Sequence, residues 1–366
     1  MDRRNFLATA FTLRETGLAA LTAQKLLEAI ALFEMAYASG FMAGSHLPIS
    51  VRLLANEQMP LRLAAKEHMI VTLTRAGIEV LASAEFIGSP VGELRRFPQI
   101  GELFSRVAEL LPDEQPHSCI LDMGDGDDLG NYPRIAFSSA KPETVLIPDP
   151  YFHANANYDA LRHKVGVLGL PWEQRQPVLF WRGSAGGHRH FTPEPDNPPR
   201  FDWLDRAQLC HKAKQSRHAG MIDIALSSLH QIAEPTLRAQ ITEAGLTATP
   251  VPADSFMNYR YLLDIDGWSN SWSLLHKLIM GSTIVKVESR RGFRQWYYGE
   301  LLPWKNYIPI KADLSDFDEV LDWIATHPED CQDIAAAGAA LAGTIHLAPA
   351  MEQAAQGVLR LLLCGS

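Results

Sequence analysis

The chain has 366 residues, more than one compact core usually holds, so two domains are expected. Hydrophobic residues make up 47% of the sequence and charged residues 20%, a composition that excludes extensive disorder. The formal net charge of -9 argues against a nucleic-acid partner, because binding a phosphate backbone usually requires a basic surface.

The cysteines are sparse and contain no Cys-x-x-Cys pair; they are Cys119, Cys210, Cys331 and Cys364. This usage disfavours a cysteine zinc site and predicts reduced thiols in the cytoplasm. The apolar stretch near the N-terminus is interrupted by Arg14 and Glu15, which is unlike a signal peptide. Since no apolar run is long enough to cross a bilayer, we expect at most peripheral contact with the inner face of a membrane.

The first half of the chain predicts a mixture of helices and short strands. Residues 15–38 and 101–111 carry apolar side chains at helical intervals, which predicts two helices. The region 59–83 is apolar but shows no clear division into elements. Short strands are expected at 118–123 and 144–148.

The second half alternates strands with helices. Short apolar runs predict strands at 178–181, 221–226, 261–265, 283–287 and 307–310. A helix is expected over 271–280, and Ser315 with Asp318 has the spacing of a capping box for another. This alternation is typical of a doubly wound α/β domain, in which ligands bind beyond the carboxyl ends of parallel strands.

A first candidate site follows the strand at 178–181. Arg182, Gly183 and Ser184 begin a glycine-rich turn that reaches Arg189. Glycines allow a backbone to approach a phosphate closely, and the two arginines could neutralise a diphosphate. The alternative is a solvent-exposed loop with incidental arginines.

A second candidate site follows the strand at 261–265. Asp266-Gly267 precedes Ser269 and Asn270, either of which would cap the next helix. The free N–H groups of a helix start suit an anion such as a phosphate. The alternative is an ordinary strand-to-helix turn.

Metal binding is not predicted. Asp264 and Asp266 form an Asp-x-Asp pattern that can hold a divalent cation, but this spacing often occurs by chance. The histidine pairs lack helical ligand spacing and a carboxylate third partner, which favours surface histidines; they are His188 with His190 and His211 with His218.

A glycine-rich acidic turn follows the strand at 118–123. Its carboxylates are Asp122, Asp125, Asp127 and Asp128. They do not have the spacing of an EF-hand loop, but a carboxylate at a strand end can act as a general base. The alternative is a solvated acidic turn.

Taken in order, these motifs resemble glycosyltransferase family 90, which includes fungal capsule-associated transferases, animal protein O-glucosyltransferases and bacterial lipopolysaccharide transferases. The segment 180–184 is similar to the Phe-Arg-Gly-Ser motif of that family. The most specific similarity is the block 261–267, Ser271, 277–282, 285–287, 295–298, 302–304, 306–310 and 313–316. The resemblance covers 117–345 and leaves 1–110 unrecognised.

The resemblance implies an α/β, GT-B-like fold, in which two Rossmann-like domains face each other across a cleft. We expect an acceptor-side domain with a helical start at 1–170 and a nucleotide-sugar-binding domain at 171–345. A C-terminal helix at 346–366 is expected to pack back on the first domain.

The resemblance also implies an inverting, metal-independent transfer from a UDP-sugar, with no cofactor. Aligning the family's Arg-Asp-Tyr-Pro segment places Asp125 as the catalytic base. Asp127 is the alternative, because Gly124 and Gly126 flank Asp125 and a Tyr-Pro pair follows only at 132–133.

Ser273 stands where the animal enzymes carry an arginine that helps to bind the donor diphosphate. This departure resembles the bacterial branch, so we expect transfer of a hexose or pentose, glucose or xylose favoured, to lipopolysaccharide, capsule or a related glycan or glycolipid. Trp296 and Tyr297 line the sugar or base pocket, or are core aromatics. The donor-binding candidates are Arg182, Gly183, Ser184, Arg189, Asp266, Gly267, Ser269, Ser271, Lys277, Lys286 and Trp296. The alternative function is a catalytically inactive nucleotide- or sugar-binding protein of the same fold.

Overall fold

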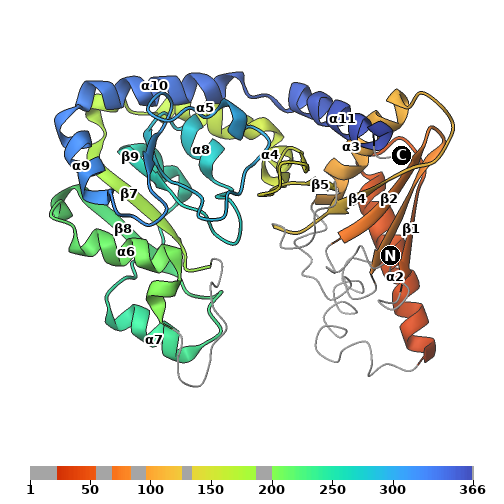
Figure 1. Ribbon diagram of the computed structural model, residues 1–366, viewed down its shortest axis with the longest axis horizontal. Helices are drawn as coiled ribbons and strands as arrows, with labels where there is room; N and C mark the ends of the chain where they lie inside the picture. The colour runs from red at the N-terminus through yellow and green to blue at the C-terminus, as the bar shows by residue number, and fades with distance from the viewer. Residues whose placement is uncertain (1–22, 55–67, 84–95, 126–133, 187–199, 365–366) are drawn as a thin grey trace. The chain divides into compact units, whose positions relative to one another are not determined.

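The computed structural model describes residues 23–54, 68–83, 96–125, 134–186 and 200–364. The chain divides into two compact units (Figure 1). Unit 1 holds Met1–Ala156 and Leu347–Ser366, and unit 2 holds Asn157–His346. The first division therefore falls after Ala156, whereas the sequence interpretation placed it after residue 170.

Unit 1 is built on a six-stranded mixed sheet with the order β1-β3-β2-β4-β5-β6. Its strands are β1 (Ile49–Leu54), β2 (His68–Thr74), β3 (Gly77–Ser83), β4 (His117–Asp122), β5 (Arg134–Ala136) and β6 (Val145–Leu146). Strand β2 is antiparallel to β3 and β4, and the other neighbours are parallel. The Rossmann-like character expected of this half therefore applies only to part of the sheet.

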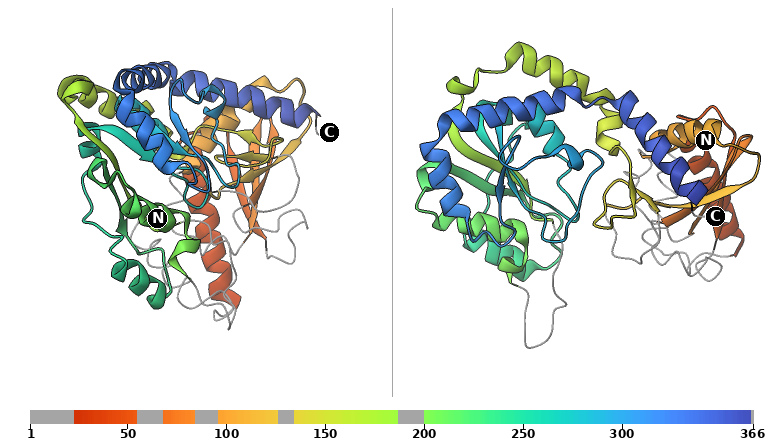
Figure 2. Two further views of the ribbon diagram at one scale, coloured as in Figure 1. Left: turned by 60° about the vertical axis from the view of Figure 1, so that its left-hand side comes forward. Right: turned by 45° about the horizontal axis from the view of Figure 1, so that its top comes forward.

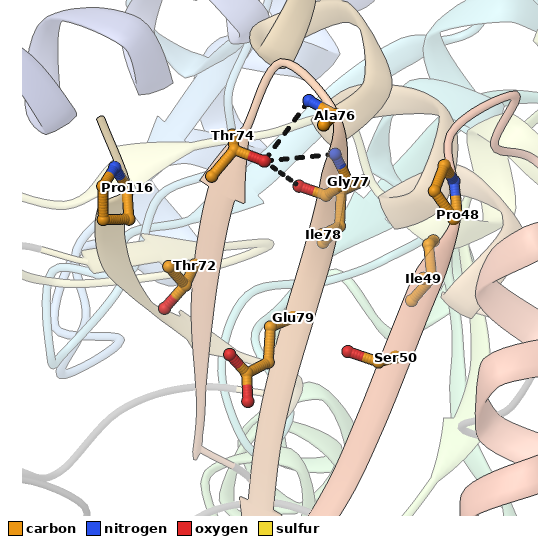
Figure 3. A pocket seen from close by; sticks show the side chains of 10 residues that line it. All are labelled: Pro48, Ile49, Ser50, Thr72, Thr74, Ala76, Gly77, Ile78, Glu79 and Pro116. Atoms are coloured by element: carbon orange, nitrogen blue, oxygen red, sulfur yellow. Dashed lines mark hydrogen bonds between the residues drawn. The ribbon is translucent and has the colours of Figure 1, made fainter. Parts of the chain in front are cut away.

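The hairpin between β2 and β3 explains the antiparallel strand. Only Arg75 and Ala76 connect the paired residues Thr74 and Gly77, and so short a connection cannot return a strand in parallel. Thr74 Oγ1 accepts hydrogen bonds from the N–H groups of Ala76 at 3.3 Å and Gly77 at 3.2 Å (Figure 3). This is the region 59–83 that the sequence did not divide.

The helices of unit 1 are α2 (Ala23–Met42), α3 (Phe97–Leu110), α4 (Pro150–Ala154) and α11 (Leu347–Cys364). Helix α11 packs on α3, β4 and β6, and Figure 2 shows it beside α3. Phe41 of α2 stacks on Phe97 of α3 with ring centroids 4.3 Å apart. The two helices approach closely because Gly101 has no Cβ, which would lie 1.9 Å from the carbonyl oxygen of Phe41.

A shallow pocket of about 470 Å³ opens at the hairpin end of this sheet (Figure 3). Thr72, Glu79 and Pro116 are among its lining residues. Because Leu73 pairs with His117 and His68 pairs with Asp122, the pocket lies at the opposite end of β4 from the acidic turn. It is therefore separate from the predicted base.

Unit 2 is built on a five-stranded sheet with the order β11-β10-β9-β7-β8, and every pair is parallel. Its strands are β7 (Gln176–Ser184), β8 (Ile222–Ser228), β9 (Tyr259–Asp264), β10 (Thr283–Val287) and β11 (Ile308–Ile310). The predicted α/β class and the parallel sheet of this half are confirmed. The carboxyl ends of all five strands share one edge.

The helices of unit 2 are α5 (Asp159–Leu168), α6 (Asp205–Gln215), α7 (Pro235–Glu243), α8 (Leu274–Ile279), α9 (Phe317–Thr326) and α10 (Pro328–Thr344). Helix α6 runs alongside β8 (Figure 1). Alternate strand residues such as Leu263 and Val285 form a core with α6, α7 and α9. Side chains alternate along a strand, so Asp264 and Lys286 point to the opposite face.

Two predicted helix starts are wrong. Helix α9 begins at Phe317 after Asp316, and Ser315 is not its cap; Asp316 Oδ1 instead accepts from the Lys311 N–H at 2.9 Å. Helix α8 begins at Leu274 after Ser273, three residues later than expected. Among the described helices, none alone is long and apolar enough to cross a membrane.

Candidate functional site

A buried group of charges lies at the carboxyl ends of β9 and β10. Asp264, the last residue of β9, is fully buried. Lys277 Nζ of α8 lies 2.7 Å from its Oδ1, and Lys286 Nζ of β10 lies 3.2 Å from its Oδ2. Both lysines are themselves buried. A buried carboxylate persists only with such partners, because it has lost its hydration.

Opposing effects set the ionisation of this group. Burial alone would raise the pKa of Asp264, but the charges of Lys277 and Lys286 outweigh it and lower the pKa to about 2. Burial lowers the pKa of Lys277, whereas for Lys286 the nearby carboxylates outweigh burial and raise it. Asp264 is therefore an anchor for two lysines, and both of its oxygens face ammonium groups.

Asp266 lies two residues further along the chain. Its Oδ1 is 3.8 Å from Lys286 Nζ and, among the described residues, has no hydrogen-bond partner. Burial raises the pKa of Asp266, and Lys286 opposes this effect. Within the described ranges, no three His, Cys, Asp or Glu side chains form a group that could hold a metal ion.

Arg206 joins the ends of two strands. From α6, its Nε donates to the Asp266 carbonyl at 2.9 Å, and its Nη1 donates to the Ser184 carbonyl at 3.2 Å. Its Nη2 donates to the Ile265 carbonyl at 3.3 Å. The sequence did not single out Arg206, because one arginine near the start of a helix carries no motif. It holds the end of β7 against the residues that follow β9.

The candidate glycines fit against side chains of the same unit. A Cβ on Gly183 would lie 2.4 Å from the Trp181 ring, and a Cβ on Gly267 would lie 2.9 Å from Arg206 Nη2. A Cβ at either position would therefore force the neighbouring side chain to shift. A role for the two glycines in donor binding stays a prediction.

Residues 265–273 form a loop, and this corrects the helix start predicted beyond Asp266-Gly267. Helix α8 has only six residues, and neither Ser269 nor Asn270 caps it. The hydroxyl of Ser269 and both amide atoms of Asn270 are buried and, in the described part of the chain, have no hydrogen-bond partner. An unpaired buried polar group costs roughly 1–3 kcal/mol, so these three atoms are candidates for contacts with a polar ligand.

Ser271 connects this loop to a later segment of the chain. Its carbonyl accepts from Gln295 Nε2 at 2.9 Å, and its hydroxyl lies 3.2 Å from that of Ser273. The bond from Gln295 attaches the loop to the aromatic segment that follows. Trp296 there is half-buried, Tyr297 is a core residue, and Lys286 Nζ lies 5.2 Å from the ring centroid of Tyr298.

Arg182 forms an ion pair with a carboxylate of β8. Its Nη2 lies 2.6 Å from Asp223 Oδ1, and its guanidinium lies over the Phe180 ring at 4.8 Å. The Ser184 hydroxyl donates to Gln231 Oε1 at 3.0 Å. The structure thus brings together Lys277, Lys286 and Asp266 but pairs Arg182 with β8. Arg189 lies outside the described residues.

In unit 1, Asp125 follows β4 and forms an ion pair with Arg96. Arg96 Nη2 lies 2.6 Å from Asp125 Oδ1, and the Asp125 side chain is 43% exposed. Its neighbour Asp122 is buried, and Asp122 Oδ1 accepts from the Gly124 N–H at 2.7 Å. Asp127 lies outside the described residues, so the choice between the two candidate bases stays a prediction.

Residues 154–348, more than half of the chain, match the sequence profile of glycosyl transferase family 90. The chain belongs to this family. The family resemblance seen in the sequence motifs is thus confirmed. The matched residues include all of unit 2 and therefore its buried lysines and the loop 265–273.

Animal proteins are among the relatives of this family 90 chain. It is 28% identical to protein O-glucosyltransferase 2 of Danio rerio over 179 residues, which are 49% of this chain and 31% of that protein. It is 31% identical to protein O-glucosyltransferase 3 of Homo sapiens over 233 residues, 54% of this chain and 43% of that protein. The chain thus spans less than half the length of these curated relatives.

Solved structures give a weaker likeness. Anabaena HepE in complex with UDP-glucose has 12% identity and a TM-score of 0.33, over 54% of this chain and 51% of that one. WaaG, a glycosyltransferase involved in lipopolysaccharide biosynthesis, has 13% identity and a TM-score of 0.33, over 54% and 50%.

Proposed function

We propose that this protein transfers a hexose or pentose, glucose or xylose favoured, from a UDP-sugar to a hydroxyl of a glycan or glycolipid such as lipopolysaccharide or capsule. Membership of family 90 supports sugar transfer, and the names of the animal relatives favour glucose. The choice of acceptor follows from the resemblance to the bacterial branch of the family, which rests on Ser273. The reaction is assigned to the cytoplasmic side and uses no cofactor.

One observation carries the donor assignment. Lys277, Lys286 and Arg206 surround two carboxylates at the end of β9, next to a loop with unpaired buried polar atoms. A leaving diphosphate is anionic and accepts many hydrogen bonds, so it complements both the excess cations and the amide of Asn270. This charge supports a transfer that needs no metal.

The proposed step is a single displacement at the anomeric carbon. The acceptor oxygen forms a bond to that carbon while the bond to the diphosphate oxygen breaks, which inverts the configuration. The hydroxyl proton passes to the carboxylate of Asp125, and the nucleoside diphosphate leaves with the bonding electrons. A base of this kind contributes about 10²–10⁴-fold to the rate.

The first test is a thermal-shift screen of the purified protein against UDP-, GDP- and CMP-sugars, since a ligand that binds only the folded state raises the melting temperature. UDP-glucose or UDP-xylose is expected to give the largest shift. A larger shift with GDP- or CMP-sugars would overturn the assignment of the nucleotide.

Turnover tests the rest of the proposal. Transfer to lipopolysaccharide or capsule glycans should persist in EDTA and fall at least about 100-fold in Asp125→Asn. Activity that EDTA abolishes and manganese restores would overturn the metal-independent mechanism. Near-normal turnover by Asp125→Asn would remove Asp125 as the base.

A second function is favoured by Ser273 and by Gly124 and Gly126 on either side of Asp125, which depart from the family pattern that the sequence resembles. A catalytically inactive protein would bind UDP-sugar in calorimetry but neither transfer nor hydrolyse it across a broad acceptor panel. Detection of any transferred sugar that depends on Asp125 would exclude this alternative.

A further inference from the structure

We infer that Arg96 is a positioning residue that fixes the carboxylate of the proposed base Asp125. The inference rests on the proposed function, because it assigns Arg96 a role in the same reaction. Arg96 lies just before α3, in the part of the sequence that showed no family resemblance. It acts across 29 residues of chain on the turn that follows β4.

The guanidinium of Arg96 holds three successive residues. Its Nη1 donates to the carbonyls of Met123 and Gly124, the latter at 3.2 Å. Its Nη2 donates to Asp125 Oδ1 at 2.6 Å. A planar guanidinium with its donors in a fixed fork sets both the path of the turn and the orientation of the carboxylate.

The two partners differ in exposure. The side chain of Arg96 is 10% exposed, whereas that of Asp125 is 43% exposed. Arg96 also packs its guanidinium over the ring of Phe137 at 5.5 Å, which limits its movement. The arginine is therefore part of the framework, and the carboxylate it holds reaches solvent, where an acceptor can approach.

Only one of the two carboxylate oxygens is engaged by Arg96. Oδ1 accepts the arginine hydrogen bond, and among the described residues Oδ2 has no partner. A base needs one oxygen free to accept the acceptor proton and a fixed direction in which to present it. Arg96 thus leaves Oδ2 for the acceptor hydroxyl.

A second contact, made by Asp122, fixes the same turn. Asp122 Oδ1 accepts from the Gly124 N–H at 2.7 Å, and His68 Nε2 lies 3.5 Å from Asp122 Oδ2. Both His68 and Asp122 are buried. The alternative is that Arg96 only holds the backbone carbonyls of the turn and has no effect on the Asp125 side chain. The two roles predict different effects of Arg96 variants on kcat.

The test compares Arg96→Met, Arg96→Lys and Asp125→Asn with their double variants. We expect Arg96→Met to lower kcat about 100-fold while leaving the donor KM within about twofold, because misplacement of a catalytic group affects the chemical step. Arg96→Lys should recover part of the loss, and added guanidinium should partly rescue Arg96→Met. In the Asp125→Asn background, Arg96→Met should cause little further loss, since both changes remove the same function.

The matched control is Arg75→Met. Arg75 also bonds a backbone carbonyl, that of Leu111, with Nε at 2.9 Å, and pairs with Glu114, but at the hairpin end of the sheet. Its loss should leave kcat unchanged. The inference would be overturned if Arg96→Met lowered kcat by the same factor in the native protein and in the Asp125→Asn background. It would also be overturned if Arg96→Met changed only the donor KM.

Hydrogen exchange separates this inference from the proposed function. In Arg96→Met, the amides of the 123–125 turn should exchange at least tenfold faster than in the native protein, while those of β2 stay unchanged. If the native protein transfers no sugar, the proposed function and the catalytic role of Arg96 both fail, and unchanged exchange would also remove the structural anchoring. If Arg96→Met does not fold, Arg96→Lys is expected to show smaller changes in kcat and in amide exchange in the same direction. Native kcat and native exchange in Arg96→Lys would then overturn the inference.

Discussion

The Nζ atom of Lys277 donates a hydrogen bond of 2.7 Å to Oδ1 of Asp264, and a second lysine, Lys286, lies 3.2 Å from the other oxygen. One carboxylate thus holds two buried ammonium groups together. The sequence motif Asp264-Ile265-Asp266 therefore belongs to an ion cluster at the carboxyl ends of the strands. The stability of this cluster depends on the balance between its carboxylates and its lysines.

Replacing Asp264 by Asn should destabilise unit 2 strongly. The change leaves buried Lys277 without its counter-ion and Lys286 with only Asp266, 3.8 Å away, and breaking such a buried pair typically costs about 3–5 kcal/mol. Urea unfolding followed by tryptophan fluorescence measures the loss. Asp322→Asn is the matched control, because Asp322 pairs with Arg217 and His218 on an exposed surface and its loss should change little. Equal stability of Asp264→Asn and the native protein would contradict this reading.

The same ion cluster predicts a pH dependence. The pKa of Asp264 is lowered to about 2 from an ordinary 3.8, so its contribution is present above about pH 4 and lost as the pH falls towards 2. The difference in unfolding free energy between the native protein and Asp264→Asn should therefore shrink over that range. Urea titrations at several pH values test this, and a difference that stays constant down to pH 2 would be inconsistent with a lowered pKa.

Gly267→Ala should weaken the junction between the ends of β7 and β9. The new Cβ would lie 2.9 Å from Arg206 Nη2 and displace the guanidinium from its carbonyl partners. We expect a lower melting temperature and weaker binding of UDP in calorimetry. In a double-mutant cycle with Arg206→Met, the two effects should not add. Gly220→Ala is the control, since no atom lies within 4 Å of its Cβ; additivity of the first pair would contradict the contact.

Asn270→Leu should separate stability from binding. If Asn270 serves the internal structure, its replacement should lower the stability of the protein. If it serves a ligand, its replacement should leave the unliganded protein as stable or more stable. We expect an unchanged or higher melting temperature together with at least about tenfold weaker UDP binding, since each 1.4 kcal/mol changes the affinity tenfold. A destabilised variant with native affinity would assign Asn270 to the fold.

Thiol reactivity should be confined to one cysteine. Burial raises the pKa of the thiols of Cys119, Cys210 and Cys331 to about 12, whereas Cys364 is exposed. Ellman's reagent should therefore react rapidly with one thiol per folded chain and with all four after denaturation. Rapid reaction of a Cys364→Ser variant would show that a buried thiol is accessible.

The sheet of unit 2 could be predicted because its strands are continuous apolar runs. The run 283–287 coincides with β10, and 261–265 differs from β9 by one or two residues at its ends. Strand β2 could not be placed, because its antiparallel direction depends on a two-residue turn inside a region of mixed apolar and polar residues with no clear division. Ser315 has the sequence of a helix cap, but Leu314 adopts a left-handed conformation with φ of 59°. The residue in the cap position of α9 is therefore Asp316.

The candidate site could be predicted only where its residues are close together in the sequence. The position of the loop after β9 follows from the strand that precedes it. The pairing of Lys277 and Lys286 with Asp264 joins residues 13 and 22 positions apart. Arg206 reaches the carbonyl of Asp266 across 60 positions and that of Ser184 across 22. No spacing rule relates such residues, because their proximity is produced by the packing of α6 and α8 on the sheet.

Helix α11 completes unit 1 although all of unit 2 precedes it in the chain. Met351, Ala355 and Val358 of this helix are buried against the first unit. During synthesis on the ribosome, unit 2 has its entire sequence once His346 emerges, while the earlier unit still lacks a helix of its core. The portion that is translated first is thus the last that can finish folding.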